Sequence, residues 1–427
     1  MKERVCNNKN QKKNPGVLLS AVSSNSGKTA AACGLMSAFK QTGKRVSACK
    51  CGPDYIDPMF HREVLGVDSK NLDLFFSEEE VLKEEYLRHT KDADITITEG
   101  VMGFYDGMSL DSVKGSSYDV AQTLGLPVIL VINARGAAMT LAAVVKGIAE
   151  FRPDSNIRGI LLNRVSVMLY PRLKAMLETE LVQIGHDEIK IVGYIPENEA
   201  FHLESRHLGL VTPQEMENLQ EKVRQAGEIL AKTVDLELLE KIAGEAVVWK
   251  AEVSEESEKI GSLKSKNDPG RIAVARDEVF CFYYKDNLEL LESLGCELIE
   301  FSPLRDEKLP DNISGLILGG GYPELYGKQL SENQSMLTSI RKALMQEKIP
   351  CLAECGGFMY LHEEMEDTAG NVWKLVGRIK GRTFPTGKLV RFGYVNLQRN
   401  LDEDQISELK ERMSIADSWI LPGENIR

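Results

Sequence analysis

The sequence predicts an α/β protein that contains two open parallel sheets joined by a polar linker. Short apolar, β-branched runs alternate with helical patterns in both halves of the 427 residues, which is typical of parallel strands covered by helices on both faces. A stretch rich in Glu, Lys and Ser separates the halves. We therefore expect four parts: a frayed tail at 1–15, a first domain at 16–239, a linker at 240–270 and a second domain at 271–427.

In the first domain, strands are expected at the apolar runs and helices between them. The run GVLLSAV at 16–22 begins the series, and a helical pattern follows it at about 28–41. Further strands are expected at 45–50, 95–100, 126–134, 157–165 and 189–196, and further helices at 139–150 and 171–184. In such a sheet, ligands bind at the carboxyl ends of the strands.

The second domain repeats the alternation on a smaller scale. Strands are expected at 271–277, 296–302, 315–321 and 349–355, with helices at 287–295 and 334–347. This pattern predicts a second open α/β sheet.

Composition and charge exclude several classes of protein. A formal net charge of −12 argues against general nucleic-acid binding. No apolar run reaches the ~18 residues of a membrane span, and the basic start lacks the apolar segment of a signal peptide. The eight cysteines contain no C-x-x-C pair, so we expect reduced thiols in the cytoplasm and neither a zinc site nor a disulfide scaffold.

The segment SSNSGKT at 23–29 lies between a predicted strand and a predicted helix, where a phosphate loop belongs. Backbone N–H groups and the helix N-terminus would cradle the anion. Lys28 would reach the outer phosphates, and the Thr29 hydroxyl would bind Mg²⁺. A standard loop has Gly at position 22, where Val22 stands, so a Ser/Gly turn that caps a helix is the alternative. The residues expected to bind the nucleotide are Ser26, Gly27, Lys28 and Thr29.

Two acidic segments also follow predicted strands. In ITITEGVMGFYDG, Glu99 ends a strand and could hold Mg²⁺, whereas Asp106 could serve the substrate or make a turn. In KCGPDYIDPMFH, Lys50 ends a strand, and Asp54 and Asp57 follow in a loop stiffened by two prolines. Oxygen ligands for a nucleotide-bound metal are one interpretation of that loop, and a pair of Pro-Asp turns is the other.

A basic cluster occurs in FHLESRHLGL, near the end of the first domain. Arg206 and His207 suit an anionic substrate because the Arg side chain binds carboxylates in a fork. A solvated helix start is the alternative.

The segment PCLAECGG at 350–357 is an apolar strand that meets a sharp Gly turn. Such an elbow exposes a nucleophile, here Cys355, whereas a buried structural thiol is the alternative. The loop LGGGYPE would supply backbone donors for an oxyanion from Gly320 and Gly321. His362 is expected on the following helix, turned away from the thiol. The other cysteines are expected to be structural: Cys6, Cys33, Cys49, Cys51, Cys281, Cys296 and Cys351.

At these residues the sequence resembles the cobyrinic acid a,c-diamide synthases, a branch of the cobyrinate and cobyrate glutamine amidotransferase family. The resemblance covers nearly the whole chain, through KCGPDYIDPMFH, NLDLFF, EGVMGFYDG, RHLGL, IAVARDEVFCFYY and ECGGFMYL. RHLGL and NLDLFF favour the diamide synthase branch. The resemblance implies a P-loop NTPase-like first domain, similar to dethiobiotin synthetase, and a class I glutaminase-like, flavodoxin-like second domain.

Three departures from the family pattern stand out. The family usually has glycine where Ala21 and Asn25 stand, and an acid where Asn133 stands. The family's glutaminase His lies in an H-E-F-H-Y-like segment, which does not occur before Arg427. The missing segment has two interpretations: the chain is truncated, or its glutaminase lacks its catalytic base.

The resemblance implies an ATP- and Mg²⁺-dependent amidation of the a and c acetate carboxylates of cobyrinic acid, in cobalamin biosynthesis. The second domain would release ammonia from glutamine through a thioester on Cys355, and the first would convert each carboxylate to an acyl phosphate. Thr29, Asp54, Asp57 and Glu99 are the expected metal ligands. Lys50, Tyr55, Asp106, Arg206 and His207 are expected to bind the substrate.

Other functions remain open at this point. A nickel-sirohydrochlorin a,c-diamide synthase would use the same chemistry on a nickel tetrapyrrole. An ATPase switch that resembles the division-site and partition ATPases belongs to another class, and residues 271–357 argue against it. A regulatory P-loop ATPase with an inactive glutaminase fold is a third alternative. The oligomeric state is open, with a homodimer as the alternative to a monomer.

Overall fold

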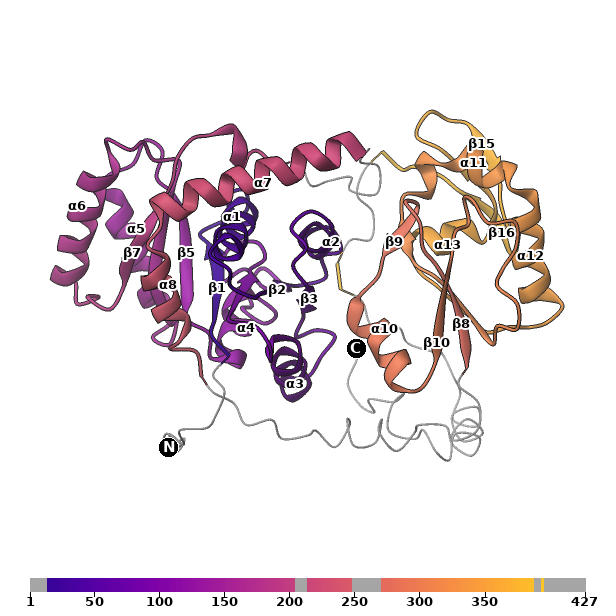
Figure 1. Cartoon of the computed structure of the whole chain (residues 1–427), viewed down its shortest axis with the longest axis horizontal. Helices are drawn as coiled ribbons and strands as arrows, with labels where there is room; N and C mark the ends of the chain where they lie inside the picture. The colour runs from indigo at the N-terminus through magenta and orange to yellow at the C-terminus, as the bar shows by residue number, and fades with distance from the viewer. Residues whose placement is uncertain (1–13, 204–212, 248–269, 388–392, 395–427) are drawn as a thin grey trace. The chain divides into compact units, whose positions relative to one another are not determined.

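The computed structural model describes residues 14–203, 213–247, 270–387 and 393–394 (Figure 1). All the elements below belong to the first of the chain's two units, which ends at Gly387. In the described part of the chain, no helix is long and apolar enough to cross a membrane.

The first half of the chain folds around a seven-stranded sheet in which all neighbouring strands run parallel. In spatial order the strands are β3 (Ser69–Leu72), β2 (Val46–Cys51), β4 (Ile95–Glu99), β1 (Gly16–Ala21), β5 (Val128–Asn133), β6 (Ile157–Asn163) and β7 (Lys190–Ile195). This confirms the predicted α/β class. Sequence analysis missed β3, because SKNL is short and mostly polar.

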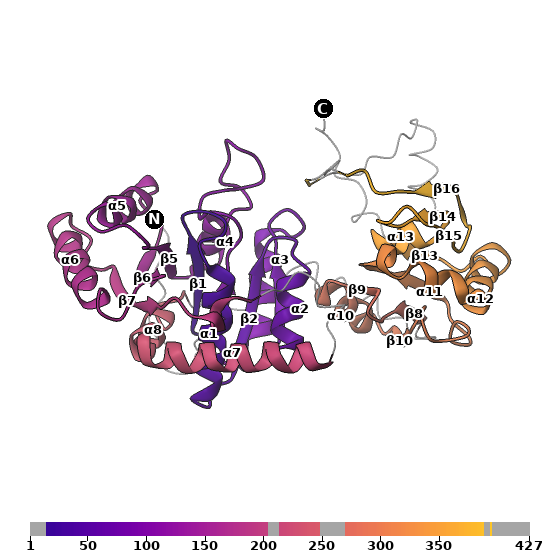
Figure 2. The ribbon, with the colours of Figure 1, turned by 90° about the horizontal axis from the view of Figure 1, so that it is seen from above.

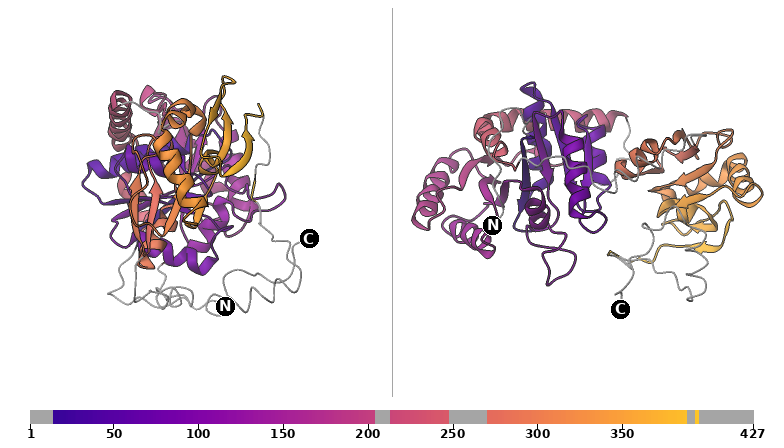
Figure 3. Two further views of the ribbon diagram at one scale, coloured as in Figure 1. Left: turned by 90° about the vertical axis from the view of Figure 1, so that its right-hand side faces the viewer. Right: turned by 90° about the horizontal axis from the view of Figure 1, so that it is seen from below.

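Helices cover both faces of this sheet because alternate strand residues feed two separate cores. In β1, Val17 and Leu19 enter one core and Leu18 enters the other. The first core is closed by α1 (Lys28–Gln41), α2 (Ile56–Glu63), α7 (Pro213–Thr233) and α8 (Leu236–Ala243). The second core is closed by α3 (Glu79–Thr90), α4 (Ser117–Leu124), α5 (Thr140–Phe151) and α6 (Tyr170–Gln183). Figures 2 and 3 show α7 and α8 on one side of the sheet and α5 on the other.

Burial on both faces explains the near-continuous apolar strands of the sequence. The helix predicted at 28–41 matches α1, whereas α8 extends to Ala243, past the expected start of the linker. A short 3-10 helix, η1 (Glu199–Phe201), follows β7.

The strand order places the ends of β1, β4 and β2 side by side. The chain runs from β1 outward to β2 and β3 and returns to β4, whereas β5, β6 and β7 extend on the other side of β1. The register aligns Glu99 of β4 with Lys50 of β2 on one side and with Leu19 of β1 on the other. Residues that follow these three strands therefore meet at one edge of the sheet.

The second half contains a four-stranded parallel sheet with its own core. Its strands, in spatial order, are β10 (Glu297–Phe301), β8 (Arg271–Ala275), β11 (Gly315–Leu318) and β13 (Cys351–Ala353). The accompanying helices are α10 (Lys285–Ser293), η3 (Pro323–Leu325), α11 (Gly327–Glu332), α12 (Gln334–Met345) and α13 (Gly356–Tyr360). The main strands and helices predicted for this half are therefore present.

Smaller sheets in this half correct two details of the prediction. The strand expected at 315–321 is divided, because β11 ends at Leu318 and β12 (Gly320–Gly321) pairs with β9 (Phe280–Phe282). His362 does not lie on a helix: α13 ends at Tyr360, and His362 begins β14 (His362–Glu366). Strand β14 pairs with β15 (Val372–Lys374) and β16 (Ile379–Thr383).

Candidate active site

The segment between β1 and α1 has the geometry of a phosphate loop. Gly27, directly before the helix, has φ +96°, and a Cβ there would lie 2.2 Å from Nδ2 of Asn163. The same Nδ2 donates to the backbone oxygen of Ser26 at 2.9 Å, which fixes the loop to the end of β6. Asn25 has φ +61°, a conformation that Asn tolerates better than most residues, whereas Val22 has no positive φ. The loop therefore needs Gly27 but no Gly at 22.

Lys28 is buried and connects this loop to the segment after β4. Its Nζ donates to the backbone oxygen of Ser23 at 3.3 Å and to the backbone oxygen of Met102. Burial and then Lys50 lower the pKa of Lys28. Within the described residues, the hydrogen bonds of its amino group go to neutral carbonyl oxygens, which phosphate oxygens could replace.

Three charged side chains meet beside the loop at the same edge of the sheet. Thr29 Oγ1 donates to Oε1 of Glu99 at 2.6 Å, and Lys50 Nζ donates to the same oxygen at 2.9 Å. Lys50 also pairs with Oδ2 of Asp57 at 2.6 Å. Glu99, Lys50 and Asp57 are 0%, 4% and 8% exposed, respectively. Lys50, which was expected to neutralise the substrate, therefore forms ion pairs with two carboxylates of the protein itself.

The electrostatics of this cluster follow from one lysine shared by two carboxylates. Burial lowers the pKa of Lys50, but Glu99 and Asp57 raise it more, so that its pKa lies above the ordinary value. Burial raises the pKa of Glu99, but Lys50, His61 and Thr29 together lower it more, so that this group is a carboxylate. Burial and then Glu99 raise the pKa of Asp57 to about 7. The excess negative charge suits a divalent cation.

Two other predicted acids have backbone partners. Oδ1 of Asp54 accepts from the backbone N–H groups of Ile56 and Asp57 at 2.8 and 3.0 Å, which holds the start of α2. Oδ2 of Asp106 accepts from the backbone N–H of Gly103 at 2.9 Å, as expected of its turn interpretation. Within the described ranges, no group of three or more His, Cys, Asp or Glu side chains forms a metal cage.

Three further residues were expected to bind the substrate: Tyr55, Arg206 and His207. Tyr55 directly precedes α2 and is half-buried. Arg206 and His207 lie outside the described residues.

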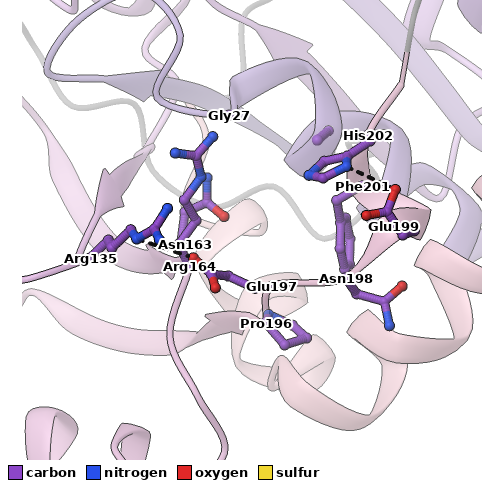
Figure 4. Close-up of a pocket in the computed structure, with 11 residues that line it drawn as sticks. Gly27, Arg135, Asn163, Arg164, Pro196, Glu197, Asn198, Glu199, Phe201 and His202 are labelled. Carbon is purple, nitrogen blue, oxygen red and sulfur yellow. Dashed lines mark hydrogen bonds and ion pairs between the residues drawn. The ribbon is translucent and has the colours of Figure 1, made fainter.

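A pocket of about 600 Å³ opens beside the phosphate loop (Figure 4), and sequence analysis missed it. Arg135 follows β5, Arg164 follows β6, and the segment after β7 closes the space. Arg135 pairs with Glu197 at 3.5 Å. The pocket is lined by Gly27, Ala30, Arg135, Asn163, Arg164, Pro196, Glu197, Asn198, Glu199, Phe201 and His202. The signal available in the sequence was that Arg135 and Glu197 directly follow predicted strands and that Arg164 lies near the end of another.

The second half contains the predicted elbow. Cys355 lies between β13 and α13 with φ +47° and ψ −112°, and its side chain is exposed. Gly357 allows this turn, since a Cβ there would lie 2.1 Å from the backbone oxygen of Leu318. A Cβ on Gly320 would lie 3.3 Å from the Cβ of Cys355, and a Cβ on Gly356 would lie 3.2 Å from the backbone nitrogen of Gly321, so both glycines lie beside the elbow.

The other described thiols are less accessible than Cys355. Burial raises the pKa of Cys281 to about 12 and that of Cys351 to about 11, which disfavours their thiolates. His362 was considered because a thiol nucleophile needs a base; its Nδ1 forms a hydrogen bond of 2.9 Å with the backbone oxygen of Phe358. Cys33, Cys49 and Cys51 are buried, Cys281, Cys296 and Cys351 are half-buried, and Cys6 lies outside the described residues.

Comparisons with known proteins agree with both halves of this geometry. Residues 17–211 match the CobQ/CobB/MinD/ParA nucleotide binding domain, and residues 271–410 match the CobB/CobQ-like glutamine amidotransferase domain. The cobyrinate a,c-diamide synthase of Clostridium tetani is 43% identical over 90% of this chain and 82% of that protein. The enzymes of the same name from Clostridium acetobutylicum and Priestia megaterium are 41% and 39% identical, over 89% and 86% of this chain and 82% and 77% of theirs.

Proposed function

The chain belongs to the cobyrinate a,c-diamide synthase family, and we propose that it amidates two acetate carboxylates of cobyrinic acid with ATP and glutamine. The relatives' names favour cobyrinate over a nickel tetrapyrrole. The match at 271–410 to an amidotransferase domain argues against a P-loop ATPase with a purely regulatory role.

The first half activates the carboxylate. A substrate carboxylate oxygen attacks the γ-phosphorus of ATP, the bond to ADP breaks, and an acyl phosphate forms. Ammonia then attacks the acyl carbon, phosphate leaves with the former carboxylate oxygen, and the amide remains after loss of a proton. Lys28 leaves its two carbonyl partners and neutralises charge on the transferring phosphoryl group.

Mg²⁺ fits the residues beside the loop. It keeps several water and phosphate ligands, so one or two protein groups are enough to hold it. Oε1 of Glu99 lies beside the Thr29 hydroxyl, and both are the hard oxygen ligands that Mg²⁺ takes. Thr29 and Glu99 would hold the ion directly or through water, with Asp57 nearby, and the ion would offset phosphate charge.

The pocket next to Gly27 is the proposed site of the nucleotide base. It adjoins the phosphate loop and has room for a base, whose edge Asn163 and the backbone after β7 could bind. Arg135 and Arg164 could contact the ribose or the phosphates.

The second half releases ammonia from glutamine. The Cys355 thiolate attacks the carboxamide carbon, backbone N–H groups of Gly320 and Gly321 stabilise the oxyanion, and ammonia leaves once it has gained a proton. Water then hydrolyses the thioester to glutamate. We place the enzyme in the cytoplasm, which supplies ATP and keeps Cys355 reduced. A homodimer is a further prediction, which analytical ultracentrifugation of the full chain would test.

The observation that carries this proposal is the convergence of Lys28, Thr29 and Glu99 at one sheet edge. Its chemistry is tested with cobyrinic acid labelled with ¹⁸O in its carboxylates, together with MgATP and ammonium chloride. An acyl-phosphate route places one ¹⁸O in inorganic phosphate for each amide formed. Amide formation with unlabelled phosphate would exclude this route.

A further inference from the structure

His61 is a buried histidine that the mechanism above does not use. It lies on α2 four residues after Asp57, so both side chains extend from the same face of the helix toward Lys50 and Glu99. The imidazole is completely buried, and its Nδ1 lies 3.0 Å from Oγ of Ser69, which is also completely buried. One ring nitrogen is thus fixed by the first residue of β3.

The other ring nitrogen faces Glu99. Nε2 of His61 lies 3.6 Å from Oε2 of Glu99, and neither atom has a hydrogen-bond partner among the residues that the structure describes. By contrast, Oε1 of Glu99 has two donors, Thr29 and Lys50. Two buried polar atoms that lack partners are costly unless they interact, so His61 is the residue placed to hold the second oxygen of this carboxylate.

The charge of Glu99 selects the tautomer of the ring. If Nε2 were unprotonated, its lone pair would face a carboxylate oxygen of Glu99 and be repelled by it. The favourable arrangement has the Ser69 hydroxyl donating to Nδ1 and Nε2–H pointing at Oε2 of Glu99. The resulting chain of donors runs from Ser69 through His61 to Glu99.

We propose that His61 is a positioning residue, whose Nε2–H orients the Glu99 carboxylate so that its Oε1 faces Thr29 and the divalent cation of the bound nucleotide. The inference rests on the proposed function, because it requires a cation at Glu99. Residues that orient a metal-binding side chain are typically worth ~10–100-fold in metal affinity.

Asn and Gln variants separate this role from simple packing. The amide nitrogen of His61→Gln can take the place of Nε2 and reach Glu99. The amide of His61→Asn takes the place of Nδ1 and reaches only Ser69. Ser69→Ala removes the donor to Nδ1 with a minimal change of shape. Glu99→Gln tests the cation site itself.

The measurement is Mn²⁺ binding to the full chain with a non-hydrolysable ATP analogue, followed by electron paramagnetic resonance of the free ion. Thermal midpoints without metal are recorded in parallel. We expect His61→Asn to weaken Mn²⁺ binding by about tenfold or more, Ser69→Ala to weaken it less, and His61→Gln to bind within about threefold of the wild type.

The outcomes distinguish the inference from the function it rests on. If Glu99→Gln binds Mn²⁺ like the wild type, the cation site of the proposed function is wrong. If Glu99→Gln weakens binding but His61→Asn and Ser69→Ala do not, His61 does not position Glu99. His61 would be only a packing residue if His61→Gln lost as much Mn²⁺ affinity as His61→Asn. The same would hold if the variants lost affinity only in proportion to the fall in their thermal midpoints.

Discussion

Lys50 determines the charge balance at the edge of the first sheet. It is buried between Glu99 and Asp57, with N–O distances of 2.9 and 2.6 Å. Neither carboxylate could stay ionised in this position without it, because a buried charge that lacks a counter-charge loses its hydration with no compensation. The lysine therefore allows two acids to stand near a phosphate loop before any cation arrives.

The first prediction concerns removal of that lysine. Lys50→Met should lower the free energy of unfolding by about 3–5 kcal/mol, since it leaves two buried acids unpaired. Urea unfolding of the full chain measures this. The double variant Lys50→Met/Glu99→Gln should recover part of the loss. A single variant as stable as the wild type would show that the pairs contribute nothing to stability.

The second prediction is a pH dependence due to Asp57, whose pKa burial and Glu99 raise to about 7. A folded-state pKa above the unfolded value means that the folded protein retains a proton that the unfolded chain releases. Stability from this group is therefore present below about pH 4 and is lost as pH rises to about 7. The stability of Asp57→Asn relative to the wild type should rise between pH 5 and 7.5 in thermal melts. A difference that is constant with pH would contradict the raised pKa.

At the scale of elements, the elbow between β13 and α13 depends on its glycines. Cys355 adopts φ +47°, and the following turn passes so close to β11 that position 357 has no room for a side chain. Strain at Cys355 is thus maintained by close backbone packing, which keeps the thiol exposed.

The third prediction tests this packing. In Gly357→Ala the new methyl group would lie 2.1 Å from the backbone oxygen of Leu318, so the turn must shift. We expect a lower thermal midpoint and slower alkylation of Cys355 by iodoacetamide. Gly147→Ala is the control, because Gly147 lies in α5 with no atom near its Cβ position, and it should stabilise the helix by ~0.5–1 kcal/mol. Equal behaviour of the two variants would argue against a packed elbow.

The elements that sequence reasoning found are those with strong local signals. Lys28–Gln41 begins after Gly27 and is largely apolar between its ends, and ECGG indicates the elbow at Cys355. Strand β3 was missed because its burial comes from neighbouring strands and not from its own composition. The same reason applies to the site. Arg135 and Arg164 come together only through the order of β5 and β6, and His61 is recognisable only beside Ser69 and Glu99.

At the scale of the whole molecule, two sheets carry two different chemistries. The first sheet presents Lys28, Thr29 and Glu99 beside the phosphate loop, and the second presents Cys355 at an exposed elbow. Ammonia is the only product of the second half that the first requires. The two reactions should therefore be separable by supplying ammonia directly.

The most direct test of this account is cobyrinic acid amidation with glutamine or with ammonium chloride, each with MgATP, followed by mass spectrometry of the corrinoid. The wild type, Cys355→Ala and Lys28→Ala are compared. Cys355→Ala should lose any glutamine-supported amidation that the wild type shows and keep ammonium-supported amidation, because the thiolate acts only on glutamine. Lys28→Ala should lose both by a factor of about 10³ or more, because neither nitrogen source replaces charge neutralisation at the phosphoryl group. The account is contradicted if Cys355→Ala also loses the ammonium-supported reaction, or if Lys28→Ala forms the amide at the wild-type rate.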